Sequence, residues 1–206
     1  MKRSILVAGL GRCGSSLLMQ MLAASGLRCA GDAPSYEFPI DWIEDDDGER
    51  DYYIPADFVA KHDAVKILWP ARFRVEAATG AVVVWLDRNW REQARSLRKL
   101  AATVSNDVPP ESPDVMAAMQ KNLAEMRRAS VGVLRGYPRL ETSFENIIMR
   151  ALDAARDVAE FAEGYGIVLD PAAMASVVEA RSPRCAESIS RERRLIIKEV
   201  NHGAAN

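Results

Sequence analysis

SILVAGLGRCGSSLLMQMLAASG, residues 4–26, holds the three parts of a phosphate-binding loop in their usual order. Four consecutive apolar residues, Ile5 to Ala8, predict a buried strand. A glycine-rich turn follows, and the apolar residues beyond it recur at helical spacing as far as Gly26. Such a turn at a helix N-terminus directs backbone N–H groups into one concavity that suits a phosphate. We therefore predict an α/β, three-layer P-loop NTPase-like fold, with a central parallel sheet flanked by helices.

The turn follows the Walker A spacing, except that a serine stands in place of the lysine. Ser16 falls at the position whose hydroxyl usually binds Mg²⁺. Arg12 is the nearest cation that can replace the missing lysine. The residues predicted to bind the phosphates are Gly9, Gly11, Arg12, Cys13, Gly14, Ser15 and Ser16.

The composition favours one domain over residues 1–206. Hydrophobic residues make up 49% of the 206 positions, which is enough for a sizeable core. The net charge is −2, so contact with nucleic acid requires a local basic patch. No run approaches the ~20 apolar residues of a membrane span, and the apolar run near the N-terminus is too short for a signal peptide. The cysteines lack metal-ligand spacing and indicate reduced thiols in the cytoplasm.

The loop after the first helix, residues 28–38, carries two acids that lie near the substrate in a fold of this kind. Asp32 and Glu37 are candidate general bases for a substrate hydroxyl, with Asp32 placed first. The alternative is that both are solvated loop acids. The segment 41–61, with an acidic run, suggests no chemistry beyond a solvated surface.

Two further apolar runs predict strands with polar residues of interest. VKILWP, residues 65–70, places Lys66 inside a short strand, where a lysine is justified if it reaches a phosphate. AVVVWL, residues 81–86, predicts a central parallel strand buried on both faces. Asp87 follows it, as the acid of a Walker B strand does, and would hold Mg²⁺ together with Ser16.

A basic helix is predicted over residues 91–101. Arg91, Arg95 and Arg98 fall on one face of it, which is either solvated or a patch for an anionic ligand or nucleic acid. Further on we predict helices over 114–130, 146–161 and 171–180, and a strand over 139–144. The tail is basic, and about residues 186–206 are expected to be partly flexible.

Placed together, these segments resemble the sulfotransferase branch of the P-loop superfamily. GRCGSSLL, residues 11–18, is similar to that family's phosphosulfate loop, usually written PRSGTTLL. Arg88 and Ser96 match the pair that binds the 3′-phosphate of the donor in the family. Lys66 and Pro70 resemble the family's lysine-bearing strand. The resemblance implies 3′-phosphoadenylylsulfate as donor, used without a metal.

The chain departs from this family in ways that change the expected reaction. Leu68 stands at the position of the family's histidine base, whereas some members use an acid in the loop that here carries Asp32 and Glu37. Asp87 adds a negative charge beside the phosphates, and like charges at roughly 4 Å repel by several kcal/mol at intermediate dielectric. Bound Mg²⁺ would offset that charge and implies a nucleoside triphosphate. In these features and in size the chain is similar to small phage-encoded P-loop kinases that phosphorylate 5-hydroxymethyluracil in DNA.

The leading hypothesis is therefore a kinase that transfers the γ-phosphoryl group of ATP, with Mg²⁺, to a hydroxyl acceptor. Our best guess for the acceptor is 5-hydroxymethyl-deoxyuridine in DNA, contacted through the basic helix, in a host cytoplasm if a phage encodes the chain. The base would be Asp32 or Glu37, and Arg12, Lys66 and Arg88 would offset charge on the transferring group. Two alternatives stay open: a 3′-phosphoadenylylsulfate-dependent sulfotransferase and an inactive nucleotide-binding module. The sequence indicates neither the oligomeric state nor a membrane partner.

Overall fold

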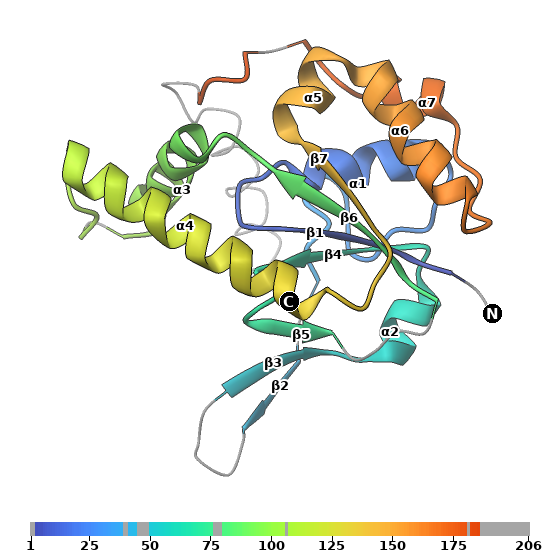
Figure 1. Cartoon of the computed structure of the whole chain (residues 1–206), viewed down its shortest axis with the longest axis horizontal. Helices are drawn as coiled ribbons and strands as arrows, with labels where there is room; N and C mark the ends of the chain where they lie inside the picture. Colours follow the sequence, from blue (N-terminus) through green and yellow to red (C-terminus); the bar gives the residue numbers. More distant parts are fainter. Residues whose placement is uncertain are drawn as a thin grey trace, which may run out of the picture.

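A four-stranded parallel sheet forms the centre of the molecule (Figure 1). The computed structural model describes residues 3–38, 41–44, 50–75, 80–105, 107–180 and 182–185. The strand order is β4-β1-β6-β7, and each neighbouring pair is parallel. All four strands therefore end at the same edge of the sheet, as the P-loop prediction requires. The strands are β1 (Ile5–Gly9), β4 (Ala64–Leu68), β6 (Val82–Asp87) and β7 (Arg139–Ser143).

Helices cover both faces of this sheet, which confirms the predicted three-layer α/β architecture. One face packs against α1 (Ser15–Ala24), α5 (Phe144–Met149), α6 (Ala151–Glu163) and α7 (Pro171–Ser176). The other face packs against α2 (Ala56–Lys61), α3 (Trp90–Val104) and α4 (Pro113–Val133). Strand residues alternate between the two layers: Ile5 and Val7 belong to the first, and Leu6 and Ala8 to the second.

A second, three-stranded sheet was not predicted from the sequence. It consists of β2 (Asp41–Glu44), β3 (Arg50–Ile54) and β5 (Phe73–Val75), in the order β2-β3-β5. β2 and β3 pair antiparallel, and β3 and β5 pair parallel. The segment 41–61, read as a solvated surface, thus contains two strands and a helix. Figure 1 shows this sheet on the side of the molecule away from α5 and α6.

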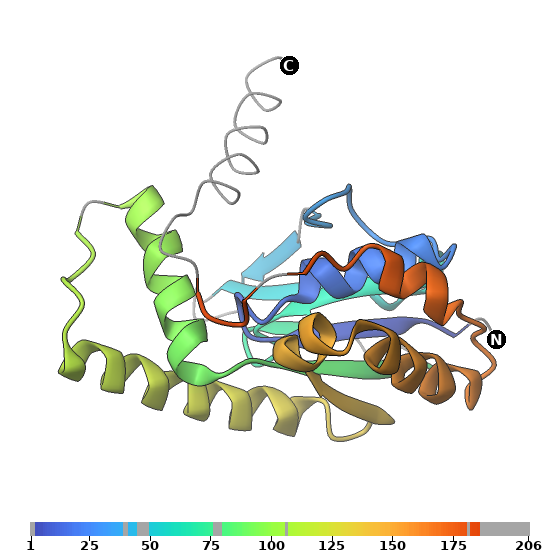
Figure 2. The ribbon, with the colours of Figure 1, turned by 90° about the horizontal axis from the view of Figure 1, so that it is seen from above.

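Helices α3 and α4 lie together at one end of the sheet (Figure 2). Each begins at a residue whose side chain caps it, Asn89 for α3 and Ser112 for α4. The segment 182–185 returns to α3, where the backbone N–H of Cys185 donates to Glu92 at 2.7 Å. The predicted flexibility of residues 186–206 lies outside the described residues.

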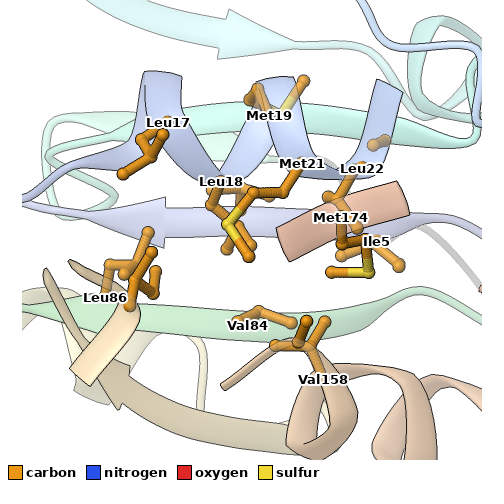
Figure 3. Packing of buried hydrophobic residues seen from close by; sticks show 14 of the residues in the cluster. Ile5, Leu17, Leu18, Met19, Met21, Leu22, Val84, Leu86, Val158 and Met174 are labelled. Carbon is orange, nitrogen blue, oxygen red and sulfur yellow. The ribbon is translucent and has the colours of Figure 1, made fainter. Parts of the chain in front are cut away.

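The core beneath α1 fixes the start of the phosphate-binding loop. Leu18, Met21 and Leu22 are fully buried against Ile5 and Val84 (Figure 3). Burying a side chain of this size contributes about 1.5–3 kcal/mol. This packing holds α1 against β1 and β6.

Two helix boundaries differ from those predicted. The segment 146–161 is not one helix, because Arg150 has φ −140° and ψ 52° and separates α5 from α6. The last described helix, α7, ends at Ser176 rather than near residue 180. Within the described part of the chain, no helix combines the length and the apolar character needed to cross a bilayer.

Replacing Leu18 by alanine tests how far this core stabilises the domain. Leu18 is 0% exposed, so Leu18→Ala should lower the free energy of unfolding by about 2–5 kcal/mol in urea titrations. Val168 is 81% exposed, and Val168→Ala should change it by less than about 0.5 kcal/mol. Equal effects of the two substitutions would contradict the packing described here.

Candidate functional site

The phosphate-binding loop joins the buried strand β1 to α1 over residues 10–14. Arg12 and Gly14 have positive φ angles of 68° and 100°, and Gly14 caps α1. The buried side chain of Gln93, on α3, donates to the carbonyl oxygen of Gly11 at 2.9 Å. Because the loop carbonyls are held by α3, the loop conformation is tied to the second helix layer.

The glycines of this loop are required by protein packing. A Cβ atom at Gly9 would lie 2.6 Å from the sulfur of Cys13, and one at Gly14 would lie 2.6 Å from the ring of Phe144. At Gly11 a Cβ atom would lie 3.0 Å from the indole of Trp69. The sequence predicted these glycines only as phosphate-binding residues, and these contacts give them a packing role as well.

Arg12, Arg88 and Ser96 form a cationic cluster beside the loop, here called the arginine centre. Arg12 Nε donates to Ser96 Oγ at 3.0 Å, and Arg88 Nη1 donates to the backbone carbonyl of Arg12 at 3.0 Å. Burial lowers the pKa of Arg12, and the nearby charge of Arg88 lowers it further. Burial is also the main cause of the lowered pKa of Arg88. Two partly desolvated cations with lowered pKa values constitute a site that a bound anion would stabilise.

Arg88 is fixed in place but not fully satisfied. Its guanidinium carbon lies 4.5 Å from the centroid of the Phe144 ring. Its Nε atom is buried and has no hydrogen-bond partner among the described residues. A buried donor without a partner is costly, and an anionic ligand oxygen would satisfy it. Arg88 and Ser96, paired in the family resemblance, both contact Arg12, and their binding of a 3′-phosphate stays a prediction.

Lys66 forms a second cationic cluster with Ser16, Ser35 and Glu37, here called the lysine centre. Strand alternation places Lys66 on the face that packs against α1, and its side chain is 2% exposed. Lys66 Nζ donates to the carbonyl oxygen of Ser35 at 2.5 Å and to Ser16 Oγ at 3.4 Å, and it forms an ion pair with Glu37. The cation that contacts Ser16 is therefore Lys66, whereas Arg12 turns towards α3.

The loop of residues 31–37 is folded around this lysine. Its ends form a β-bridge between Asp32 and Glu37, and Gly31 has a φ of 76° and leaves no room for a Cβ beside the Glu37 carbonyl. Two side chains of α1 hold the loop: Ser16 Oγ donates to the Ser35 carbonyl at 3.0 Å, and Gln20 Nε2 donates to the Pro34 carbonyl at 2.9 Å. Sequence reasoning missed Ser35 and Gln20, because Ser35 acts through its backbone and no local pattern marks such contacts.

The two candidate bases in this loop are placed differently. Glu37 pairs with Lys66 in the lysine centre. The exposed Asp32 carboxylate has no partner among the described residues. The order of preference predicted from the sequence, with Asp32 first, is therefore not the order that these contacts favour.

The Asp87 carboxylate, predicted to hold Mg²⁺ together with Ser16, contacts two other side chains of the protein. Both of its carboxylate oxygens accept from Arg127, at 2.8 Å from Nε and 2.6 Å from Nη2, and Trp85 Nε1 also donates to it at 2.8 Å. Arg127 has a raised pKa, chiefly because of its hydrogen bond to Asp87. No group of three or more His, Cys, Asp or Glu side chains in the described ranges could hold a metal ion. Sequence reasoning had no signal for Arg127, which lies 40 residues from Asp87.

The arginines predicted to contact DNA are largely paired within the protein. Arg95 lies 3.3 Å from carboxylate oxygens of Glu92 and Glu111, and Arg98 lies 3.9 Å from Glu111. Arg91 is exposed. These pairs reduce the charge that the face could offer to a phosphate backbone, and the proposed DNA contact remains a prediction.

Cys13 is a packing residue of the loop. Its thiol is fully buried, and burial raises its pKa from 9.0 to about 11. Burial and the raised pKa keep the thiolate scarce at neutral pH, which argues against Cys13 as a nucleophile there.

The raised pKa of Cys13 gives a testable pH dependence of stability. The folded state favours the neutral thiol. The contribution of Cys13 to the free energy of unfolding is therefore complete below pH 9 and is lost as the pH rises to about 11. Two pH units correspond to about 2–3 kcal/mol at full titration. Urea titrations across this range should show a smaller decline for Cys13→Ser than for the wild type. Equal declines would show that burial of the thiol does not control its ionisation.

Comparison with known proteins finds similarity in structure alone. No protein-family model and no curated protein sequence matches the chain. A sulfotransferase domain from the curacin biosynthetic pathway aligns with a TM-score of 0.53 and 11% identity, over 90% of this chain and 81% of that one. The mouse sulfotransferase SULT7A1, complexed with PAP, aligns with a TM-score of 0.55 and 8% identity, over 100% of this chain and 85% of that one. The chain therefore has the P-loop-like fold of the sulfotransferases.

Proposed function

We propose that the protein transfers a sulfuryl group from 3′-phosphoadenylylsulfate to a hydroxyl acceptor, without a metal ion. The observation that carries the proposal is the arginine centre. Its two half-buried guanidinium groups and one buried, unsatisfied donor fit a terminal phosphate bound beside the loop. A nucleoside triphosphate has no phosphate on the 3′-oxygen of its ribose for such a cluster to bind.

The two cationic centres would bind different anionic groups of the donor. The loop N–H groups and α1 would bind the 5′-phosphosulfate. The arginine centre would bind the 3′-phosphate, as the family resemblance of Arg88 and Ser96 implies. Lys66, which contacts Ser16 at the start of α1, would stabilise charge on the transferring group. The mouse neighbour was solved with PAP, adenosine 3′,5′-bisphosphate, which is the product of such a reaction.

Glu37 is the proposed base. In the reaction, the acceptor oxygen forms a bond to sulfur and the bond from sulfur to the phosphate oxygen breaks. The acceptor proton passes to the Glu37 carboxylate, and adenosine 3′,5′-bisphosphate leaves. The Glu37 side chain is 59% exposed, so an acceptor can reach it from solvent while Lys66 lies behind it.

The kinase hypothesis, with 5-hydroxymethyl-deoxyuridine in DNA as acceptor, now has less support. It needs Asp87 and Ser16 to hold Mg²⁺, and the Asp87 carboxylate is already bound by Arg127 and Trp85. It also needs a basic surface for DNA, and Arg95 and Arg98 are paired with acids of the same chain.

A donor-consumption assay in excess EDTA tests the proposed function. The protein would be given 3′-phosphoadenylylsulfate or ATP, with 4-nitrophenol, a simple alcohol or a single-stranded oligonucleotide containing 5-hydroxymethyluracil as acceptor. We expect acceptor-dependent formation of adenosine 3′,5′-bisphosphate that survives EDTA. Phosphorylated oligonucleotide, formed from ATP only when Mg²⁺ is present, would establish the kinase instead.

The assignment of the base is tested by comparing the two loop acids. Glu37→Gln keeps the shape of the side chain but removes the proton acceptor, so turnover should fall by about 10²–10⁴-fold. Asp32→Asn also removes a negative charge from this loop, four residues before Tyr36, and should lower turnover far less. The reverse ranking would return the role of base to Asp32.

The arginine centre is tested by replacing Arg88 with methionine. Arg88→Met keeps an apolar contact with Phe144 but removes the donors, and a hydrogen bond to a charged group contributes about 1.5–3 kcal/mol. Affinity for adenosine 3′,5′-bisphosphate should therefore fall by about ten- to a hundredfold. Affinity for adenosine 5′-monophosphate, which lacks the 3′-phosphate, should change much less. Equal losses for both nucleotides would contradict the assignment of this centre.

A further inference from the structure

The ammonium group of Lys66 has all of its hydrogen-bonding capacity in use. An ammonium has three donors, and Lys66 directs them at Ser16 Oγ, the Ser35 carbonyl and the Glu37 carboxylate. Its side chain is 2% exposed, so water does not compete for these positions. Any further partner of Lys66 must therefore replace one of these three.

Glu37 is the partner that can be replaced at least cost. Its side chain is 59% exposed, so a released carboxylate is hydrated at once. Ser16 and Ser35, in contrast, also bind each other at 3.0 Å and tie α1 to the loop.

The loop keeps its shape without the ion pair. Gln20 holds the Pro34 carbonyl, the Tyr36 N–H donates to the Asp32 carbonyl at 2.7 Å, and the β-bridge joins Asp32 to Glu37 through the backbone. The Glu37 side chain can therefore leave Lys66 without rearrangement of residues 31–37.

We infer that Lys66 is shared between the donor and the base, so that binding of the donor's sulfonate draws Lys66 away from Glu37 and frees the carboxylate to accept a proton. This inference rests on the proposed function, because it takes the sulfonate to lie beside Ser16. Before the donor binds, Lys66 is paired with the carboxylate of Glu37, the proposed base. The sulfonate of the donor must displace that carboxylate from Lys66. The sulfonate and the Glu37 carboxylate are both anions and compete for one ammonium.

The competition makes an unusual prediction for the base itself. Removing the Glu37 carboxylate removes the competitor of the sulfonate, so Glu37→Gln should lose most of its turnover and yet bind 3′-phosphoadenylylsulfate more tightly. A partly exposed ion pair is weak, so the expected gain in affinity is at most about fivefold, which corresponds to about 1 kcal/mol. Adenosine 3′,5′-bisphosphate has no sulfonate, and its affinity should change by less than about twofold.

The test is calorimetric titration of both nucleotides, without acceptor, into the wild-type protein and into Glu37→Gln, Glu37→Ala, Asp32→Asn and Lys66→Met. Both Glu37 variants should tighten binding of the sulfonated donor only, and thermal melting would verify that each variant is folded. Asp32→Asn is the matched control, since it removes an acid of the same loop that does not contact Lys66. Lys66→Met should weaken binding of the sulfonated donor by at least about tenfold more than binding of the bisphosphate.

The outcomes distinguish a failure of the proposed sharing of Lys66 from a failure of the proposed function. If the wild type binds both nucleotides and neither Glu37 variant binds the sulfonated donor more tightly, the sharing of Lys66 is overturned and the proposed function stands. If Asp32→Asn tightens binding as much as Glu37→Gln does, the gain reflects net charge and the sharing is likewise overturned. If the wild type binds neither nucleotide, both proposals fail.

Discussion

Burial of one ammonium group shapes the candidate site. Lys66 lies on a strand of the parallel sheet under the start of α1, and its side chain is almost completely removed from water. An isolated buried charge costs several kcal/mol unless it is paired and hydrogen-bonded. The loop of residues 31–37 supplies a carbonyl and a carboxylate for it, and α1 supplies a hydroxyl. The path of that loop, and with it the position of Glu37, follows from this requirement.

The arginine centre lies on the other side of the phosphate-binding loop, towards α3. Arg12 and Arg88 are both partly desolvated, and they are held by Ser96, by a loop carbonyl and by the ring of Phe144. A ligand with two separate anionic groups matches two separate cationic centres, whereas a compact metal–triphosphate group does not. The donor of a sulfotransferase carries its anionic groups on two positions of the ribose, and this match is the physical basis of the proposed function.

Local features of the sequence predicted the fold well. The β1–loop–α1 unit and the central strand β6 are continuous apolar or periodic runs, and the structure has them where the sequence placed them. The second sheet was missed, because β2 and β3 come from an acidic segment and β5 is only three residues long. The break at Arg150 was missed because apolar periodicity continues across it.

Several residues of the candidate site were predicted from the sequence, but the contacts between them were not. Lys66 stood out as a charged residue within an apolar strand, and its burial explains that oddity. The pairing of Asp87 with Arg127 joins residues 40 positions apart and leaves no local signal, so Asp87 resembled a metal ligand. The choice between Asp32 and Glu37 depended on which of them meets Lys66, a contact 29 residues away in the sequence for Glu37.

The metal dependence of nucleotide binding tests the account most directly. Calorimetric titration of the wild-type protein would compare adenosine 3′,5′-bisphosphate in EDTA with ATP in Mg²⁺. We expect the bisphosphate to bind tightly without a metal, because Arg12 and Arg88 supply the charge for its 3′-phosphate, and we expect ATP to bind weakly. Tight binding of ATP that is lost in EDTA, together with weak binding of the bisphosphate, would contradict this account and would mean that Asp87 leaves Arg127 to hold Mg²⁺.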